Sequence, residues 1–413
     1  MITYTEALER LLAAAEPIAR TEMIPTLYAE GRILAEAVKS TVDVPPWNNS
    51  QMDGYCLAAD AIAAATPEHP VRLPVSQRIP AGSTGTPLAT GTCARIFTGA
   101  PLPEAADVVV PQEDVERAED VERAEDVERA EDDVIFRAPA KVGTYVRRRA
   151  GDVAAGDVVA EAGAKLTPGL LGLIASVGAA YVTVMKPLRV GVFFSGNELT
   201  MPGEPLPAGS IYNSNRFTIR ALLKGLGCDV YDLGTVPDSL EKTKEAFEKA
   251  SRETDVIISS GGMSVGEEDH IKPAVESLGK IDMWRVCLKP GKPVAFGEVK
   301  GVPFIGLPGN PVSCFVTFLM LARAFILKRQ GMKNVKVRPL AVRADFAWDK
   351  AGTREEFVRV HRNENGGLDL YCTQNSQILA SCAWADGLAD IPAGAVVKPG
   401  DVVNYYPFRD LFL

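Results

Sequence analysis

Five carboxylates follow strand-like apolar runs in the middle of the chain and could bind a cation. They are Glu198, Asp238, Glu267, Glu268 and Asp269. Carboxylates gathered in one crevice repel one another unless a cation or substrate joins them, and Mg²⁺ prefers oxygen ligands together with phosphate. We therefore expect some of these acids to hold a metal ion. Asp238 precedes Ser239 and Leu240, a pattern that also starts a helix, so capping and a site role both stay open for Asp238.

Two lysines in a proline-rich segment could bind an anion opposite these acids. The segment Cys287-Leu-Lys-Pro-Gly-Lys-Pro presents Lys289 and Lys292 on a backbone stiffened by two prolines. Lysines held in this way suit a small oxyanion or a diphosphate. Three adjacent arginines at 147–149 form a second cationic run. Because their side chains point in different directions, we expect only one of them to enter a site.

Glycine-rich loops at 193–199, 259–269 and 306–313 each follow an apolar run. Strands that end in small residues leave backbone N–H groups free to converge on an anion, and open α/β sheets bind ligands at such strand ends. None of the loops has the spacing of a phosphate-binding loop or of the dinucleotide fingerprint. The loops predict an anionic ligand that is not held in a standard nucleotide-binding manner.

The elements that would position these residues alternate between strand and helix. Such alternation predicts a parallel sheet covered by helices on both faces, a doubly wound α/β domain at 187–330. The expected strands are 189–194, 228–233, 256–258 and 303–307, and the expected helices are 215–226, 240–251 and 312–328.

Three further domains surround this central domain. Short β-type runs broken by proline and glycine predict a small β domain at 46–145, inserted between two parts of a mixed linker domain, 1–45 and 146–186. The linker domain begins with an amphipathic helix near residues 5–15. Short β-like runs return at 331–413, where we expect a terminal domain resembling a β-barrel. The predicted fold class is multi-domain α/β plus β.

The cysteine content and the N-terminal residues indicate the cellular compartment of the protein. The seven cysteines are scattered, with no Cys-x-x-Cys pair, and no secretion signal is visible, so we expect a cytoplasmic protein. The uncharged stretch 166–185 is long enough to span a bilayer, but it contains Pro168 and three glycines. A short buried helix ending at Gly178, followed by a strand at 181–184, is the better interpretation, and no membrane contact is expected.

The formal net charge of -9 has a local source. Residues 113–130 are three copies of Glu-Asp-Val-Glu-Arg-Ala, which together contribute -6. The rest of the chain is nearly neutral and offers no basic face, so nucleic-acid binding is not expected. We interpret the repeat as a duplicated surface loop.

Seven motifs occur in order over nearly the whole chain. They are Asn48–Tyr55, Phe97–Pro101, Val146–Asp152, Ser195–Leu199, Ser259–Asp269, Leu288–Pro293 and Gly306–Ser313. Together they resemble the MoeA and gephyrin E-domain family of molybdopterin molybdenumtransferases. The resemblance implies the last step of molybdenum cofactor synthesis, in which adenylylated molybdopterin and molybdate give molybdenum-molybdopterin and AMP with Mg²⁺. It also implies a central domain of the MogA/MoaB type.

The resemblance also implies roles for residues. Glu198, Asp238 and Asp269 are implied as the catalytic and metal-binding acids of the central domain. Asp53 is implied as a further catalytic residue, which reaches the active site of the other subunit of a homodimer from the small domain. A contact with the molybdopterin adenylyltransferase of the preceding step is a further implied partner. The substrate-binding set is Thr98, Arg147, Ser259, Gly261, Gly262, Ser264, Lys289, Lys292, Pro308, Gly309, Asn310, Arg354 and Ser376.

Two alternative functions stay open. The first is molybdopterin adenylyltransferase, whose domain resembles residues 187–330 but lacks the flanking domains. The second is a non-catalytic scaffold built on the same fold. The segment Met52–Tyr55 and the terminal domain disfavour the first, and the lysines and carboxylates disfavour the second.

Overall fold

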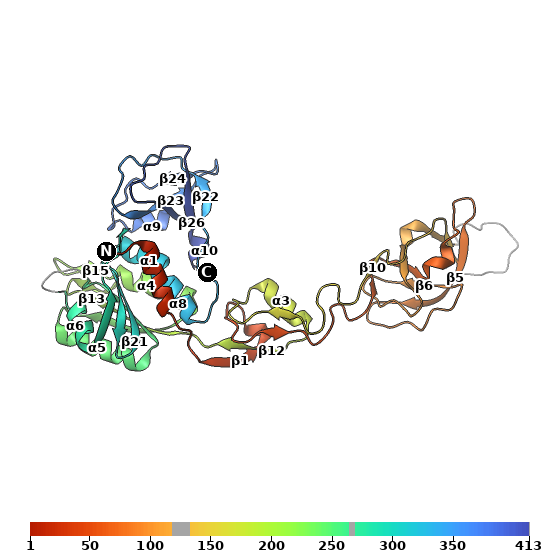
Figure 1. Ribbon diagram of the computed structural model, residues 1–413, viewed down its shortest axis with the longest axis horizontal. Helices are drawn as coiled ribbons and strands as arrows, with labels where there is room; N and C mark the ends of the chain where they lie inside the picture. The colour runs from red at the N-terminus through yellow and green to blue at the C-terminus, as the bar shows by residue number, and fades with distance from the viewer. Residues whose placement is uncertain (118–132, 264–268, 413) are drawn as a thin grey trace.

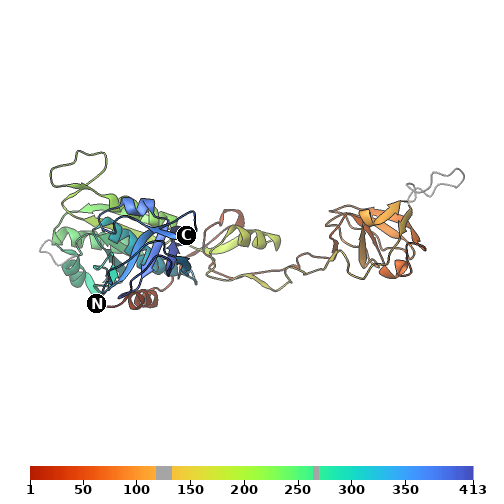
Figure 2. The same ribbon diagram turned by 90° about the horizontal axis from the view of Figure 1, so that it is seen from above.

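The computed structural model describes residues 1–117, 133–263 and 269–412. The molecule is long, with the central and terminal domains together at one end, the small domain at the other and the linker domain between them (Figure 1). The view from above shows the same extended arrangement (Figure 2). The Glu-Asp-Val-Glu-Arg-Ala repeat lies outside the described residues from Ala118 onward.

The central domain is built on a six-stranded sheet in the order β16-β13-β17-β21-β20-β18. The first four strands are parallel, which confirms the predicted parallel sheet, whereas β20 and β18 form an antiparallel edge that was not predicted. The strands are β13 (Arg189–Ser195), β16 (Asp229–Val236), β17 (Val256–Ser260), β18 (Gly279–Met283), β20 (Ala295–Val299) and β21 (Val302–Leu307).

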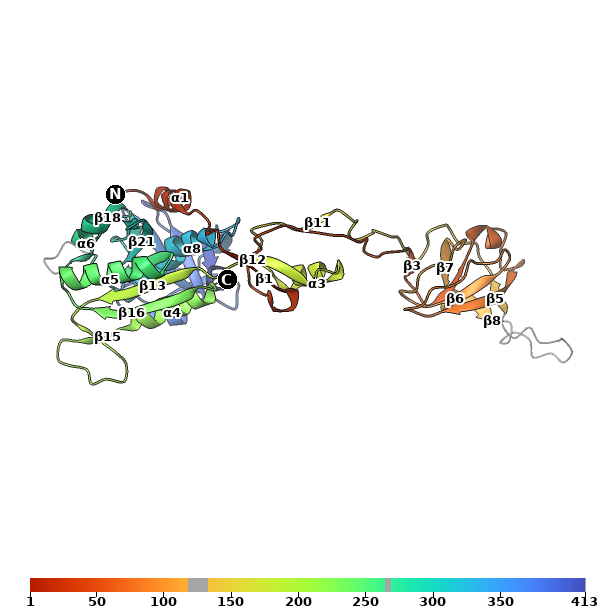
Figure 3. The same cartoon turned by 90° about the horizontal axis from the view of Figure 1, so that it is seen from below.

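Helices cover both faces of this sheet, as the alternating pattern predicted. On one face, α4 (Ser214–Gly225) packs beside a long helix at 311–329; on the other, α5 (Leu240–Glu253) and α6 (Ile271–Leu278) surround Phe193, Phe247 and Phe304. The short strands β14 (Leu199–Thr200) and β15 (Ile211–Tyr212) bracket a loop that extends away from the domain (Figure 3).

The long helix consists of α7 (Pro311–Thr317), a π-helical turn η4 (Phe318–Ala322) and α8 (Arg323–Arg329). Within the described ranges it is the one helix long and apolar enough to cross a membrane, and 89% of its apolar window is buried inside the protein. Its apolar surface belongs to the core shared by the central and terminal domains.

Helix α1 (Tyr4–Ala14) begins at a capping box, because the Thr3 hydroxyl accepts from Glu6 N and the Glu6 carboxylate accepts from Thr3 N. Its buried residues Ala7 and Leu11 lie in the core of the central domain. The sequence division grouped this helix with the linker domain, but its apolar face packs on the central domain.

The linker domain pairs β1 (Thr21–Pro25) with β12 (Tyr181–Met185), and β2 (Val38–Lys39) with β11 (Val158–Ala160). The stretch 166–185 forms α3 (Pro168–Ser176), which Thr167 caps, and then β12, so a helix followed by a strand is confirmed. The prediction that this helix is buried was wrong: Ile174 is its only buried residue, since a few residues of the linker domain cover just one side. Thr26–Tyr28 form the 3-10 turn η1.

The small domain is joined to the linker domain through the paired strands β3 (Asn49–Ser50) and β10 (Val146–Arg147). Its sheet has the order β7-β4-β6-β5-β9-β8 around its own apolar core. Its strands are β4 (Gly54–Leu57), β5 (Val71–Ile79), β6 (Cys93–Ile96), β7 (Val108–Pro111), β8 (Val115–Arg117) and β9 (Asp133–Phe136), with 3-10 turns η2 (Ala59–Ile62) and η3 (Gln112–Asp114).

The terminal domain has a sheet in the order β19-β23-β25-β26-β22, with β24 on the other side of β23. A bridge between Ala344 and Leu368 brings β24 to the end of β22, so the strands curl into the expected barrel-like shape. The elements are β19 (Leu288–Lys289), β22 (Leu340–Arg343), β23 (Glu355–Arg362), β24 (Leu368–Leu370), α9 (Ala380–Trp384), β25 (Gly387–Ile391), β26 (Val402–Pro407) and α10 (Phe408–Phe412).

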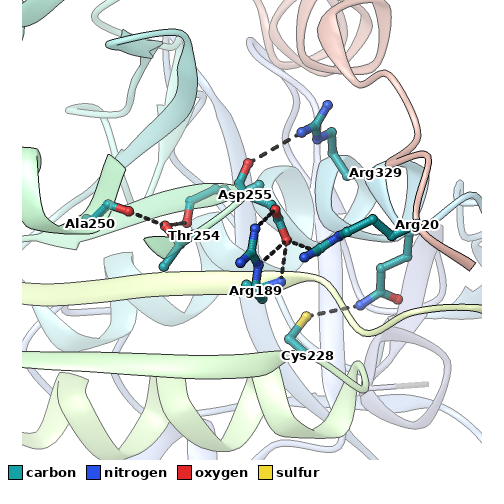
Figure 4. A network of polar contacts seen from close by, with 9 residues as sticks. Arg20, Arg189, Cys228, Ala250, Thr254, Asp255 and Arg329 are labelled. Atoms are coloured by element: carbon teal, nitrogen blue, oxygen red, sulfur yellow. Dashed lines mark hydrogen bonds and ion pairs between the residues drawn. The ribbon is translucent and has the colours of Figure 1, made fainter. Parts of the chain in front are cut away.

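A polar network ties the end of the linker to the central domain (Figure 4). The Asp255 carboxylate accepts from Arg189 N at 2.8 Å, from the Arg189 guanidinium at 2.9 Å and from the Arg20 guanidinium. Burial alone would raise the pKa of Asp255, but the hydrogen bonds from Arg189 and the charges of Arg20 and Arg189 outweigh it and lower that pKa.

Candidate active site

A cavity of about 1080 Å³ lies at the carboxyl ends of the parallel strands, between the central and terminal domains. This is where open α/β sheets bind their ligands. Most of the residues expected from the sequence line it: Glu198, Asp238, Gly261, Gly262, Asp269, Lys289, Lys292, Pro308, Gly309, Asn310, Arg354 and Ser376.

The two interpretations of Asp238 can now be separated. Ser239 is the N-cap of α5 and its side chain accepts from Lys242 N, so Asp238 is not needed as the cap. The Asp238 carboxylate instead accepts from Ser195 Oγ at 3.0 Å and from Asn197 N at 2.9 Å. These bonds hold the carboxylate against the loop that follows β13, inside the cavity wall.

The three acids do not form a complete metal cage. Glu198, Asp238 and Asp269 all line the cavity, yet no group of three His, Cys, Asp or Glu side chains in the described residues could hold a metal ion. Mg²⁺ is usually bound by one or two carboxylates, with substrate phosphate and water completing its octahedron. The donor set therefore fits a magnesium ion that arrives with a phosphate, and it does not fit a resident all-protein site.

The opposite wall is cationic, and its loop packs closely against α7. The Lys289-Pro290 peptide bond is cis, and Gly291 has φ +115°, where an added Cβ would lie 2.2 Å from Thr317 Cγ2. The loop is therefore pressed onto α7, in a backbone conformation that glycine allows. Lys289 Nζ lies 2.9 Å from Glu356 Oε2, whereas exposed Lys292 has no ion-pair partner among the residues that the structure describes.

The terminal domain closes the cavity through three hydrogen bonds with the central domain. Asn310 Nδ2 donates to Ser376 Oγ at 3.2 Å, and Val312 N donates to Ser376 O at 3.1 Å, so Ser376 sits at the start of α7. Arg354 Nη1 donates to Leu288 O at 3.0 Å, beside Lys289. Two lysines, an arginine and a hydroxyl thus face one space, which suits a small dianion.

Sequence reasoning missed several polar residues that line the cavity, among them Asn215 and Ser260. Asn215 Nδ2 donates to Ser260 Oγ at 2.9 Å and to Gly309 O at 2.8 Å, which joins the ends of β17 and β21. The polar run Asn213-Ser-Asn215 at a helix start was the available signal. Side chains alternate along a strand, so Ser260 lines the cavity whereas Ser259 is buried on the other face, its Oγ without a partner in the described structure. Ser264, Glu267 and Glu268 lie outside the described residues.

Three expected residues lie elsewhere. Asp53 Oδ1 accepts from Thr98 N at 2.8 Å and from Thr98 Oγ1 at 2.7 Å, and these bonds lower the pKa of Asp53. Arg147 is in β10, at the junction of the small domain and the linker domain. None of the three lines the cavity, and Figure 1 shows β10 at that junction and β6 within the small domain, both well away from the central domain.

Comparison with known proteins covers the chain from end to end. The MoeA N-terminal region (domain I and II) matches residues 2–178, a probable molybdopterin binding domain matches residues 191–328, and the MoeA C-terminal region (domain IV) matches residues 341–408. The matched order agrees with the order of the domains along the chain.

Individual relatives match over similar lengths. A molybdopterin molybdenumtransferase of Haemophilus influenzae is 38% identical, covering 100% of both chains, and molybdopterin molybdenumtransferase 2 of Mycobacterium tuberculosis is 33% identical, covering 94% of this chain and 95% of its own. The crystal structure of a molybdopterin biosynthesis moeA protein from Pyrococcus horikoshii superposes with a TM-score of 0.83 at 26% identity, covering 98% of this chain and 100% of that one. Full-length similarity in sequence and fold shows that this chain belongs to the MoeA family.

Proposed function

We propose that this chain is a molybdopterin molybdenumtransferase, which inserts molybdate into adenylylated molybdopterin and releases AMP. The observation that carries the proposal is one cavity with acids at the strand ends on one wall and Lys289, Lys292 and Arg354 on the other. Relatives of full length carry this enzyme name. The cationic wall suits a tetrahedral dianion, and the glycine loops suit a diphosphate.

Each wall has its own part in the reaction. Lys289, Lys292, Arg354 and Ser376 bind and orient molybdate beside the pterin. Backbone N–H groups of Gly262, Gly309 and Asn310 hold the phosphates of the adenylylated substrate. One or two of the acids Glu198, Asp238 and Asp269 would hold Mg²⁺ together with a substrate phosphate, and the ion would offset charge on the departing AMP.

The proposal includes a homodimer whose active site is shared between subunits. Asp53, Thr98 and Arg147 lie far from the cavity of their own chain, so a second copy would have to bring them to it. The linker domain also exposes Met23, Leu27, Tyr28 and Tyr181, an apolar surface that a second copy would cover. We further propose that the protein acts in the cytoplasm and receives its substrate from the adenylyltransferase of the preceding step.

A reaction with purified components tests the function. The chain is incubated with adenylylated molybdopterin and Mg²⁺, with and without molybdate, and AMP release is followed together with activation of a molybdenum-free apoenzyme. We expect both to depend on molybdate and on Mg²⁺. Adenylylation of molybdopterin with ATP would instead support the adenylyltransferase, and the absence of both activities would support a scaffold.

A further inference from the structure

Lys289 belongs to the central domain in sequence but to the terminal domain in its backbone pairing. Strand β19 pairs in parallel with β23, with Leu288 opposite Glu355 and Lys289 opposite Glu356. Two side chains at the start of β23 add to this pairing: Arg354 Nη1 donates to Leu288 O, and the Glu356 carboxylate is ion-paired with the Lys289 ammonium group. The ammonium group of Lys289, which lines the cavity, therefore belongs to a strand at the edge of the terminal-domain sheet.

The Glu356 carboxylate is fixed in one place. Its side chain is 7% exposed, against 43% for Lys289, so it has little room to follow a moving ammonium. Oε2 lies 2.9 Å from Lys289 Nζ, whereas Oε1 lies where a Cβ on Gly352 would approach it to 2.4 Å. The Lys289 ammonium also lies 5.9 Å from the Trp348 ring centroid, which adds a cation–π contact.

We propose that Glu356, which does not line the cavity, is a positioning residue for the transfer of molybdate. An ammonium group has three N–H donors. The ion pair with Glu356 holds the ammonium group in place, and the oxyanion approaches it from the cavity that Lys289 lines. Glu356 also reduces the net positive charge of the cationic wall, so it weakens the resting affinity for molybdate while holding Lys289 in the orientation that the reaction needs. This inference rests on the proposed function.

Two variants separate the effect of the negative charge of Glu356 from the effect of its position beside Lys289. In Glu356→Gln the negative charge is gone, so the dianion binds several-fold more tightly, and the less firmly held ammonium lowers turnover by about tenfold. In Gly352→Ala the charge stays, but the new methyl group displaces the carboxylate. We expect Gly352→Ala to lower turnover in the same way without tightening molybdate binding.

Molybdate affinity is measured by isothermal titration calorimetry of the full-length protein with sodium molybdate, and turnover by AMP release from adenylylated molybdopterin. Asp345→Asn is the matched control, because it removes a carboxylate that is ion-paired with Arg343 in the same domain, outside the cavity. Both quantities should match the parent protein in this control. Thermal unfolding of each variant reports whether it is folded.

The outcomes distinguish the inference from the function on which it rests. If the parent protein does not bind molybdate or release AMP, the proposed function fails. If the parent does both and Glu356→Gln turns over at the parental rate, or if its molybdate affinity falls together with turnover, the positioning role is overturned. Should Glu356→Gln fail to fold, Gly352→Ala decides: parental turnover in a folded Gly352→Ala protein would overturn the role.

Discussion

The two lysines of the cationic wall differ in what holds them. Lys292 is exposed and has no ion-pair partner in the described residues, whereas Lys289 neutralises the buried Glu356. Removing one partner of a buried pair leaves an uncompensated charge, whereas removing an exposed charge hardly changes folding. The lysines should therefore be separable by experiment even though both face the same cavity.

We predict that Lys292→Ala weakens molybdate binding by about tenfold, the equivalent of roughly 1.4 kcal/mol, and leaves the free energy of unfolding unchanged. Lys289→Ala should weaken binding and also lower the free energy of unfolding, by about 1–2 kcal/mol because Lys289 is partly exposed. Calorimetry and urea unfolding measure the two effects, with exposed Lys336→Ala as the control. Equal loss of stability in both variants would contradict the assignment.

A second residue-scale prediction concerns pH. Burial raises the pKa of Glu355 to about 7, with the charge of Asp390 adding to the effect, and burial also raises the pKa of Asp390. The folded state thus keeps a proton that the unfolded chain releases near 4.5, so the contribution of Glu355 is fully present below that pH and is lost as the pH rises through about 7.

Glu355→Gln keeps the side chain neutral at every pH. We expect it to raise the free energy of unfolding at pH 8 by about 1–2 kcal/mol and to have little effect at pH 5. Urea unfolding at both pH values measures this, with the exposed Glu364→Gln as the control. A stability gain at pH 5 equal to that at pH 8 would rule out titration of this carboxyl group as the cause.

Most of the site residues predicted from local patterns line the cavity, but their partners were not predicted. The sequence could predict Glu198, Asp238 and Lys289, because the end of a strand and flanking prolines are recognisable in short segments. The pairing of Lys289 with Glu356 could not be predicted, because the contact depends on β19 joining the sheet of another domain. It was likewise not predicted that Ser260, and not Ser259, lines the cavity, because the sequence did not show which residues of β17 point to which face of the sheet.

At the scale of elements, long periodic segments were predictable and short ones were not. Helices α4 and α5 and strands β13 and β21 lie close to the ranges expected from apolar periodicity. Strands such as β19, with two residues, are too short to show a periodic pattern, and they form only because they pair with the edge of a neighbouring strand. Helix α1 was predicted, but its packing on the central domain depends on contacts distant in sequence.

The turn before β17 is where an element-scale prediction can be made. Asp255 accepts from Arg189 at the start of β13 and from Arg20 in the linker, and its side chain is 12% exposed. Asp255→Asn should lower the free energy of unfolding at pH 7 by about 2–3 kcal/mol, because two arginines lose their shared carboxylate. Urea unfolding measures this loss, with the exposed Asp229→Asn as the control.

The lowered pKa of Asp255 determines how the stability loss in Asp255→Asn depends on pH. Since the pKa of Asp255 is lowered in the folded protein, its contribution is present above the unfolded value of 3.8 and is lost as the pH falls below it. The difference between parent and variant should therefore shrink at pH 3. A difference that is the same at pH 3 and pH 7 would show that the ion pairs are not its source.

At the scale of the whole molecule, the extended shape separates two groups of polar residues that the resemblance assigns to one site. The cavity lies at one end, and the hydrogen-bonded pair of Asp53 and Thr98 lies in the small domain at the other (Figure 1). The Asp53 carboxylate accepts two hydrogen bonds there without burial of the pair. In a homodimer with two-fold symmetry, the small domain of one chain could complete the cavity of the other.

Complementation between two inactive chains tests this arrangement. Asp53→Asn and Asp269→Asn are carried on differently tagged chains, and the mixed dimer is isolated through both tags. If each site combines the small domain of one chain with the central domain of the other, the mixed dimer has one intact site and regains about half of the parental AMP release, whereas each variant alone stays inactive. If each site uses residues of a single chain, every chain in the mixed dimer carries a defect and no activity returns, which would refute the shared site.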